Sequence, residues 1–467
     1  MSATEGGMIE GAHRFQYQFI KNLQQAIRKP DGRKSTVKDM LVLSQQNDPF
    51  YAGNGAEGGK ARWFAELWER FDYGSGVHLR RVHYRIVSEG NILKPDGELY
   101  ENNSRCWEYM QGASRQARYL GLVDPEEIVD RRNPAPNIYM GPGAIDWGDR
   151  VQPGWGYDFY GFELPGLEVP RPSVDPPDLY PTGYDYHNTM QRYHVEVWAE
   201  KTTMDDILMP LCRAQATNYV SDAGYQSITA MVSLLRARVH HMSKPCRILY
   251  VSDFDSAGRN MPRQVARQLQ FWIERYAADC DIRIEPIVMT AEQARKYPKA
   301  PETGAVELDA MEAIDPGRLA RIVRGAIAPF RDEKLRRRVW GAKQNAAEII
   351  HQEFEAVCED ELTELREIEA EAQAIYERHR ETLEGVTEAI DRALEPLRER
   401  LREAEGSITD KLYDLKPDLP DLPEAVQAPD GEDEGWLFDA RRDYLEQLTY
   451  FERSQEEGKA GDKPASS

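Results

Sequence analysis

Carboxylates follow two separate apolar runs of the sequence, at the point where each run ends. Asp253 and Asp255 come directly after the apolar run 248–251, and Glu200 follows an earlier one. Residues two apart in an extended chain point to the same side, and ligand chemistry gathers at the carboxyl ends of parallel strands. Carboxylate oxygens are also the ligands that Mg²⁺ prefers. If the two runs are neighbouring strands, the pattern predicts a Mg²⁺ site made by Glu200, Asp253 and Asp255.

Each of these acids also has a simpler interpretation. One aspartate could cap a helix that begins near Asn260 while the other lies in an exposed turn, with Gly258 allowing the chain to turn. Glu200 could complement the dipole of a following helix. Beside a bound cation, Glu200 could instead complete the metal shell or act as a general acid or base, with Lys201 next to it. The occurrence of acids at both strand ends favours the metal site.

A parallel sheet is needed to position these acids, and the surrounding sequence predicts one. Apolar strand-like runs alternate with helical patterns throughout this part of the chain. We expect strands at 194–200, 216–222, 246–253 and 282–289, and helices at 203–215, 228–242 and 261–277. This alternation is typical of an α/β fold with a mostly parallel sheet covered by helices on both faces.

An earlier segment has the element order of a winged helix. A helix at 77–87 is followed by a turn-rich stretch and a second helix at 104–120. Ser104 is placed to cap this second helix, and Gly121 is placed to stop it. The stretch 123–133 then supplies a short wing strand. Helix, turn, helix and wing together predict a DNA-binding domain.

The motifs of the α/β segment resemble a Toprim domain, the metal-binding fold shared by topoisomerases, primases and related nucleases. A Glu-Lys pair follows one strand, Gly224 and Tyr225 follow the next, and a D-x-D-x-x-G motif ending at Gly258 follows a third. The Gly-Tyr turn and this motif are similar in particular to the A subunit of type IIB topoisomerases and its relatives that make meiotic double-strand breaks. Those proteins place a winged helix before the Toprim domain, the order predicted here.

The resemblance covers the predicted winged helix and roughly residues 193–330. It implies Mg²⁺ held by Asp253 and Asp255, with Glu200 as metal ligand or acid/base. The family often has a proline after the second aspartate, where this chain has Ser256. That difference loosens the match without removing a ligand.

The family cleaves DNA with a tyrosine on its winged helix, which keeps the broken end as a phosphotyrosine. In the helix 77–87, apolar residues at i, i+3 and i+7 form one face, and Tyr84 falls on the other side. Arg80 and Tyr84 match the family's arginine-then-tyrosine spacing, and His83 stands where the family often has an aromatic residue. We therefore expect Tyr84 to be the nucleophile and Arg80 to assist it. Alternatively, Tyr84 only contacts the DNA backbone or packs on the wing.

Other residues are expected to contact DNA or support the site. Arg81 and Arg85 flank Tyr84, while Arg115 and Arg118 of the second helix could hold phosphates, read guanines or pair with nearby acids. The residues with supporting roles are predicted to be Lys201, Gly224, Gly258, Glu307 and Asp309. The last two are either additional carboxylates of the site or the start of a helix.

Three functions are compatible with these motifs. The first is a Mg²⁺-dependent transesterase that breaks double-stranded DNA through Tyr84. The resemblance then implies a homodimer, and strand passage would need a separate ATPase subunit because the sequence has no ATP-binding Gly-rich motif. The second is a Toprim nuclease in which water attacks the phosphate and the winged helix only binds DNA. The third is a non-catalytic DNA-binding protein of a mobile element.

The whole chain is expected to form six consecutive segments. They are an N-terminal helical region (1–75), the winged-helix domain (76–132), a connector rich in Pro, Gly and aromatics without regular structure (133–192), the Toprim domain (193–332), long charged helices (333–406) and an acidic tail with one amphipathic helix (407–467). The charged helices have coiled-coil-like spacing, with Gly385 and Pro396 expected to break them. They could support assembly or form an intramolecular hairpin.

Composition limits the setting of the protein. The net charge of −21 argues against a nucleic-acid coat protein, although a local basic patch remains compatible with it. The five cysteines are scattered, which indicates a reducing cytoplasm. No apolar run approaches the roughly 20 residues of a membrane span, so we expect no membrane association.

Overall fold

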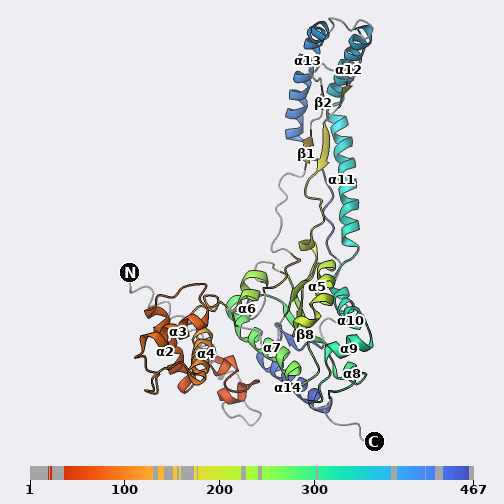
Figure 1. The fold of residues 1–467 in the computed structure, drawn as a ribbon. Coiled ribbons are helices and arrows are strands. Elements are labelled where there is room, and N and C mark those ends of the chain that lie inside the picture. Colours follow the sequence, from red (N-terminus) through yellow and green to blue (C-terminus); the bar gives the residue numbers. More distant parts are fainter. Residues whose placement is uncertain are drawn as a thin grey trace. The chain divides into compact units, whose positions relative to one another are not determined.

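The computed structural model has a mixed α/β architecture (Figure 1). It describes residues 36–129, 135–140, 151–154, 157–158, 173–175, 177–221, 228–239, 244–300, 303–379, 387–415, 417–425 and 435–461, together with 19, 22 and 23. The chain forms two compact units. The sheet unit comprises 1–143, 191–332 and 426–467, and the hairpin unit comprises 144–190 and 333–425.

The sheet unit is built around a five-stranded sheet with the order β6-β5-β7-β8-β9. Its strands are β5 (His194–Ala199), β6 (Asn218–Val220), β7 (Cys246–Val251), β8 (Ile282–Val288) and β9 (Phe438–Asp439). The pairs from β6 to β8 are parallel, and β9 is antiparallel to β8. The predicted strands and the mostly parallel sheet are thus confirmed. The predicted neighbourhood of the two acid-bearing strands is also found, because β5 and β7 pair directly.

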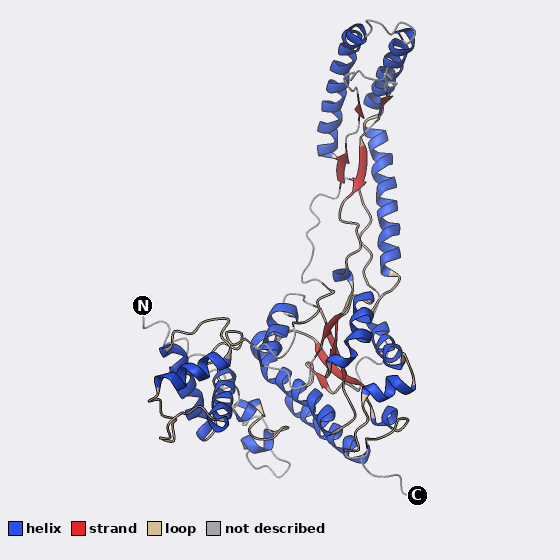
Figure 2. Ribbon diagram, in the orientation of Figure 1, coloured by secondary structure: helices blue, strands red, loops and turns tan. Residues whose placement is uncertain are grey.

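Helices cover both faces of this sheet (Figure 2). One face packs against α6 (Ile228–Ser233), a π-helix (Leu234–Val239) and α7 (Ser256–Tyr276), and the other against α5 (Asp205–Ala214), α9 (Leu308–Ile314) and α10 (Arg318–Ile327). In β7, Ile248 and Tyr250 face the first layer, while Leu249 and Val251 face the second. Alternate side chains of an extended strand point to opposite faces, so a strand covered twice is apolar throughout.

The fifth strand comes from the acidic tail, where the sequence predicted only a helix. Trp436 and Phe438 are buried, and β9 adds an antiparallel edge to β8. The predicted amphipathic helix follows as α14 (Tyr444–Gly461), and its Gln447 side chain bonds the backbone of Leu437 and Asp439. A strand of two residues carries too little periodicity to be recognised from the sequence.

The N-terminal part of the sheet unit includes the helices α2 (Ala56–Arg70), α3 (Leu79–Glu89) and α4 (Ser104–Tyr119). The helix after the turn-rich stretch is capped by Asn103, whose Oδ1 accepts from the Cys106 amide at 2.8 Å, and not by Ser104 as predicted. Gly121 has φ +71°, which suits the predicted stop. The expected wing strand is reduced, in the described residues, to a single bridge between Val77 and Ile128.

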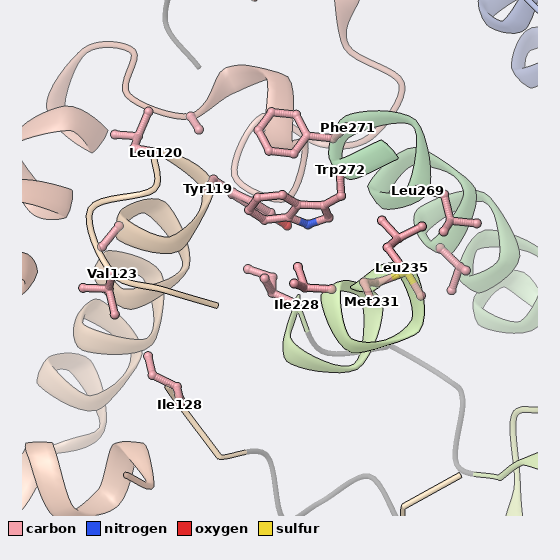
Figure 3. Close-up of a cluster of buried hydrophobic side chains, with 14 of the residues drawn as sticks. Tyr119, Leu120, Val123, Ile128, Ile228, Met231, Leu235, Leu269, Phe271 and Trp272 are labelled. Atoms are coloured by element: carbon pink, nitrogen blue, oxygen red, sulfur yellow. The ribbon is translucent and has the colours of Figure 1, made fainter. Parts of the chain in front are cut away.

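These N-terminal helices share an apolar core with α6 and α7 (Figure 3). The Tyr119 ring of α4 lies 5.4 Å from the ring of Phe271 and 5.7 Å from that of Trp272, measured between centroids. Deeper in α7, the fully buried Arg267 pairs with Asp48 at 3.2 Å. A buried ion pair of this kind fixes the N-terminal segment against α7, since separating its members would strand a charge away from water.

The hairpin unit consists of long helices and two short ribbons. Its elements are α11 (Leu335–Val357), α12 (Glu359–His379), α13 (Thr387–Asp414), the ribbon of β1 (Val151–Gly154) with β4 (Asp178–Pro181), and the ribbon of β2 (Tyr157–Asp158) with β3 (Ser173–Val174). The predicted coiled-coil-like spacing is matched by an intramolecular pairing of α12 with α13, and Arg400 bridges them to Glu364 at 2.6 Å. Pro396 lies inside α13 and does not end it, contrary to the prediction, while Gly385 falls outside the described residues.

The ribbons show that the connector has regular structure where none was expected. The remaining short helices are Val37–Met40, Pro49–Tyr51, Asn188–Met190, Thr202–Met204, Ala291–Ala294 and Ala328–Phe330. Among the described residues, none of the helices combines the length and apolar character needed to cross a membrane.

Candidate functional site

The parallel pairing of β5 with β7 brings Glu200 and Asp253 together. Ala199 is in register with Val251, so the two strands end side by side. The amide of Glu200 donates to the Val251 carbonyl at 2.9 Å, and the amide of Asp253 donates to Glu200 Oε2 at 3.2 Å. The Glu200 side chain thus lies across the end of β7. We call Glu200, Asp253 and Asp255, with the adjoining Lys201 and Glu307, the carboxylate site.

Asp253 is the most enclosed member of the carboxylate site. It is 2% exposed, and Oδ1 accepts from the Leu308 amide at 2.8 Å. Its Oδ2 forms an ion pair with the Lys201 ammonium, which also bonds Glu307. Glu307 is held there because Phe254 and Val306 exchange backbone hydrogen bonds at 2.9 and 3.0 Å. Asp253 is therefore fixed by contacts on both oxygens.

Asp255 has the capping role that the simpler interpretation gave to one aspartate. Its Oδ1 accepts from the Gly258 amide at 2.6 Å, which caps α7 at Ser256 and not near Asn260. Gly258 is required by close packing. A Cβ at this position would lie 2.2 Å from the Asp253 carbonyl oxygen and 3.2 Å from Glu200 Oε2. The glycine thus lets α7 begin directly against the two other acids.

Burial and neighbouring charge act against ionisation of Glu200. The pKa of Glu200 is raised to about 7, chiefly by desolvation and also by the negative charges of Asp253 and Asp255, against the opposing hydrogen bond from the Asp253 amide. Burial also raises the pKa of Asp253, against the opposing hydrogen bonds from Lys201 and Leu308. The Lys201 hydrogen bond lowers the pKa of Glu307. A cation placed among these acids would relieve the repulsion, as the chemistry of coupled carboxylates requires.

The carboxylate oxygens of the site are of the type that binds a hard cation, but the Lys201 ammonium already contacts one of them. All three predicted ligands offer carboxylate oxygens, the type that Mg²⁺ selects. In the arrangement described, however, one oxygen of Asp253 is bound to the Lys201 ammonium and one of Asp255 caps a helix. Within the described ranges no three His, Cys, Asp or Glu side chains are grouped as metal ligands. A cation at Oδ2 of Asp253 would share that oxygen with the Lys201 ammonium.

Of the other predicted supporting residues, only some lie at the carboxylate site. Glu307 lies at the N-cap of α9 and joins the carboxylate site through Lys201. Asp309 is exposed in the first turn of α9. Gly224 lies outside the described residues. That Lys201 bridges two acids, and that Leu308 donates to Asp253, could not be predicted from local patterns, because both contacts depend on the distant Phe254–Val306 pairing.

Helix α3 presents Tyr84 to solvent, as the helical spacing predicted. Tyr84 is 60% exposed, whereas Val82 and Ile86 are fully buried. His83 is also buried, and its ring nitrogens contact Tyr100 Oη at 2.6 Å and Asn102 Oδ1 at 3.2 Å. These hydrogen bonds anchor α3 directly beside Tyr84. The centroids of the His83 and Tyr84 rings are 5.3 Å apart.

Three arginines are exposed around Tyr84, and we call them with Tyr84 the arginine–tyrosine face. Arg81 stacks over Tyr73 at 5.9 Å, and Arg85 pairs with Glu89 at 2.9 Å. Arg80 lies one turn before Tyr84 on the same helix. Exposed guanidinium groups at this spacing suit the oxygens of a phosphate.

The two arginines of α4 that were predicted to contact DNA, Arg115 and Arg118, are engaged within the protein. Arg115 donates to Asn47 Oδ1 at 2.8 Å, which ties α4 to the N-terminal segment. Arg118 is buried, and its NH1 lies 3.4 Å from Thr229 Oγ1 of α6. Of the acids predicted as alternative partners, Glu126 pairs with Arg236 at 2.6 Å and Glu127 accepts from Trp68 Nε1 at 2.9 Å, while Asp130 lies outside the described residues. Arg118 is therefore not presented to a ligand, contrary to the expectation of a DNA contact.

Comparison with known proteins adds no assignment to this geometry. No protein-family model matches the chain, and no curated protein matches it.

Proposed function

We propose that the protein is a Mg²⁺-dependent DNA-cleaving transesterase of the type IIB topoisomerase A subunit type. The observation that carries this proposal is the register of β5 and β7, which sets Glu200 beside Asp253 with Asp255 at the start of α7. The order of a helical domain followed by a mostly parallel sheet supports a winged helix and a Toprim domain. The exposed Tyr84 supplies a nucleophile on the first of these.

The reaction is a transesterification and needs no oxidant or reductant. The Tyr84 oxygen forms a bond to phosphorus, and the bond from phosphorus to one deoxyribose oxygen breaks. The phenolic proton is lost and the departing sugar oxygen gains one, so the step is balanced. Arg80 would offset the phosphate charge, and Glu200 has a pKa of about 7, which suits proton exchange near neutral pH. Bound Mg²⁺ would supply Lewis-acid stabilisation of the phosphate oxygens.

Double-stranded DNA is the proposed substrate. Cleavage of both strands would require two copies of the chain, so we propose a homodimer. A separate ATPase subunit would be needed for strand passage. These partners follow from the resemblance to the family.

Plasmid cleavage separates the proposed reaction from its alternatives. Purified protein is incubated with supercoiled plasmid and Mg²⁺ and stopped with detergent, with and without protease. The wild type should yield protein-linked ends that Tyr84→Phe and Asp253→Ala both abolish. Tyr180→Phe is the matched control, because Tyr180 is exposed in the hairpin unit. Activity that survives Asp253→Ala would reject the carboxylate site.

A second candidate is a Toprim nuclease that uses water, for which the same carboxylate site would serve without Tyr84. A half-buried acid with a pKa of about 7 is suited to deprotonate water as well as phenol. In the same plasmid experiment, free ends formed equally by wild type and Tyr84→Phe would select this function. Absence of any cleavage with every metal and partner tested would select a non-catalytic DNA-binding protein.

A further inference from the structure

The Lys201 ammonium occupies the centre of the carboxylate site. It pairs with Asp253 and Glu307 at once, from a position directly after Glu200. Asp253 is almost completely buried, whereas Glu307 is 41% and Lys201 33% exposed at the side chain. One cation is thus shared between an inner and an outer carboxylate.

Contacts that do not involve Lys201 also position Asp253 and Glu307. Phe254 and Val306 fix the two acids by their backbone pairing, and Leu308 donates to the other oxygen of Asp253. Asp253 therefore keeps one hydrogen bond, and both acids keep their backbone positions, independently of the ammonium. Lys201, by contrast, carries its charge on a flexible four-carbon stem that is open to solvent.

A buried carboxylate requires a counter-charge, because an uncompensated charge is costly away from water. Without metal, Lys201 is the cation that contacts Asp253. An ammonium and Mg²⁺ on the same carboxylate would repel each other, since like charges a few ångströms apart interact strongly where water is scarce. Binding of the metal therefore competes with Lys201.

We propose that Lys201 is a displaceable internal counter-ion of the carboxylate site. Mg²⁺ takes its place on Asp253, and the released ammonium turns outward to pair with a DNA phosphate. This inference rests on the proposed function, because it assigns the metal to Asp253. It makes Lys201 a residue that couples metal occupancy to DNA binding.

Metal affinity tests the competition without any need for DNA or cleavage. Lys201→Met should bind Mg²⁺ about tenfold more tightly than the wild type in calorimetry. A tenfold change in affinity corresponds to only a modest part of the repulsion between two close charges. Lys343→Met is the matched control, because Lys343 is also 33% exposed and paired with an acid, Asp185, at 2.7 Å in the hairpin unit. Equal or weaker binding by Lys201→Met would overturn the inference.

The wild type gives a second measurement that no folding defect can obscure. Its lysines are acetylated briefly with an activated acetate ester, and the extent at Lys201 is read by mass spectrometry. Mg²⁺ alone should increase acetylation of Lys201 several-fold and leave Lys343 unchanged, and added DNA should then protect Lys201. An unchanged or reduced rate with Mg²⁺ would contradict the displacement.

Asp253→Asn distinguishes the failure of this inference from the failure of the proposed function. If the wild type binds Mg²⁺ and Asp253→Asn does not, the metal site stands and the lysine results decide the inference. If the wild type binds no Mg²⁺, or if Asp253→Asn binds it equally, both the proposed metal site and the role of Lys201 are rejected.

Discussion

The carboxylate site and the arginine–tyrosine face are organised in opposite ways. The first is enclosed, and its acids are fixed by strand register, backbone amides and the Lys201 ammonium. The second is an exposed helix surface anchored by the buried His83, and its Tyr84 is 60% exposed beside the His83 ring. Substitutions at the carboxylate site should therefore disturb structure and function together. Those on the face should affect function alone.

The largest expected effect is on Gly258, where the carboxylate site is tightest. Gly258→Ala would place a Cβ 2.2 Å from the Asp253 carbonyl oxygen, so it should lower the free energy of unfolding by about 3 kcal/mol. Gly112→Ala in α4 is the control, since no atom lies within 4 Å of its added Cβ, and it should stabilise by about 0.5 kcal/mol. Denaturant unfolding measures both. Similar values for the two variants would show that the site is not closely packed.

Adjacent residues of α3 should respond differently to truncation. His83→Ala removes buried contacts with Tyr100 and Asn102 and should cost about 1–3 kcal/mol of unfolding free energy. Tyr84→Ala removes an exposed ring and should change it by less than about 0.5 kcal/mol. Thermal and denaturant melts of both variants provide the comparison. A large loss for Tyr84→Ala would mean that the tyrosine is a structural residue.

Charge on the arginine–tyrosine face should appear in the salt dependence of DNA binding. Replacing Arg80, Arg81 or Arg85 with alanine should each reduce the slope of log affinity against log salt by about 0.9, if each contacts one phosphate. Arg402→Ala on α13 is the control, because Arg402 is 62% exposed and belongs to the hairpin unit. Fluorescence anisotropy with a short duplex gives the slopes. Equal slopes for all variants would remove the face from the DNA surface.

A smaller effect is expected in the pH dependence of stability of the sheet. Burial raises the pKa of Glu285 on β8 to about 7, with Arg442 acting in the opposite direction. The folded chain then keeps a proton on Glu285 that the unfolded chain has released near pH 4.5, so stability should fall as pH rises from 4.5 through 7. Glu285→Gln should flatten this part of the profile, measured by denaturant midpoints. An unchanged profile would exclude Glu285 as its source.

Strand periodicity made much of the sheet unit predictable. The runs that became β5, β7 and β8 are largely apolar because both faces of the sheet are covered, and acids follow the ends of β5 and β7. The solvent exposure of Tyr84 was also predicted correctly from the helical spacing of its apolar neighbours. These features are local, so a single segment contains the information.

Features that depend on distant segments could not be predicted in this way. Strand β9 pairs with β8 from the far end of the chain, and Lys201 reaches Glu307 only because Val306 pairs with Phe254. Arg118 looked available for DNA on its helix, but α6 covers it. In each case, tertiary packing decides the partner and leaves no mark in the local pattern.

Identification of the residue joined to DNA tests the central claim most directly. Wild-type protein is allowed to cleave plasmid with Mg²⁺, denatured, and digested with nuclease and trypsin before mass spectrometry. The account predicts a nucleotide attached to Tyr84 in the tryptic peptide 82–85, and no such adduct in Asp253→Ala. Cleaved DNA together with an unmodified peptide 82–85 would contradict it.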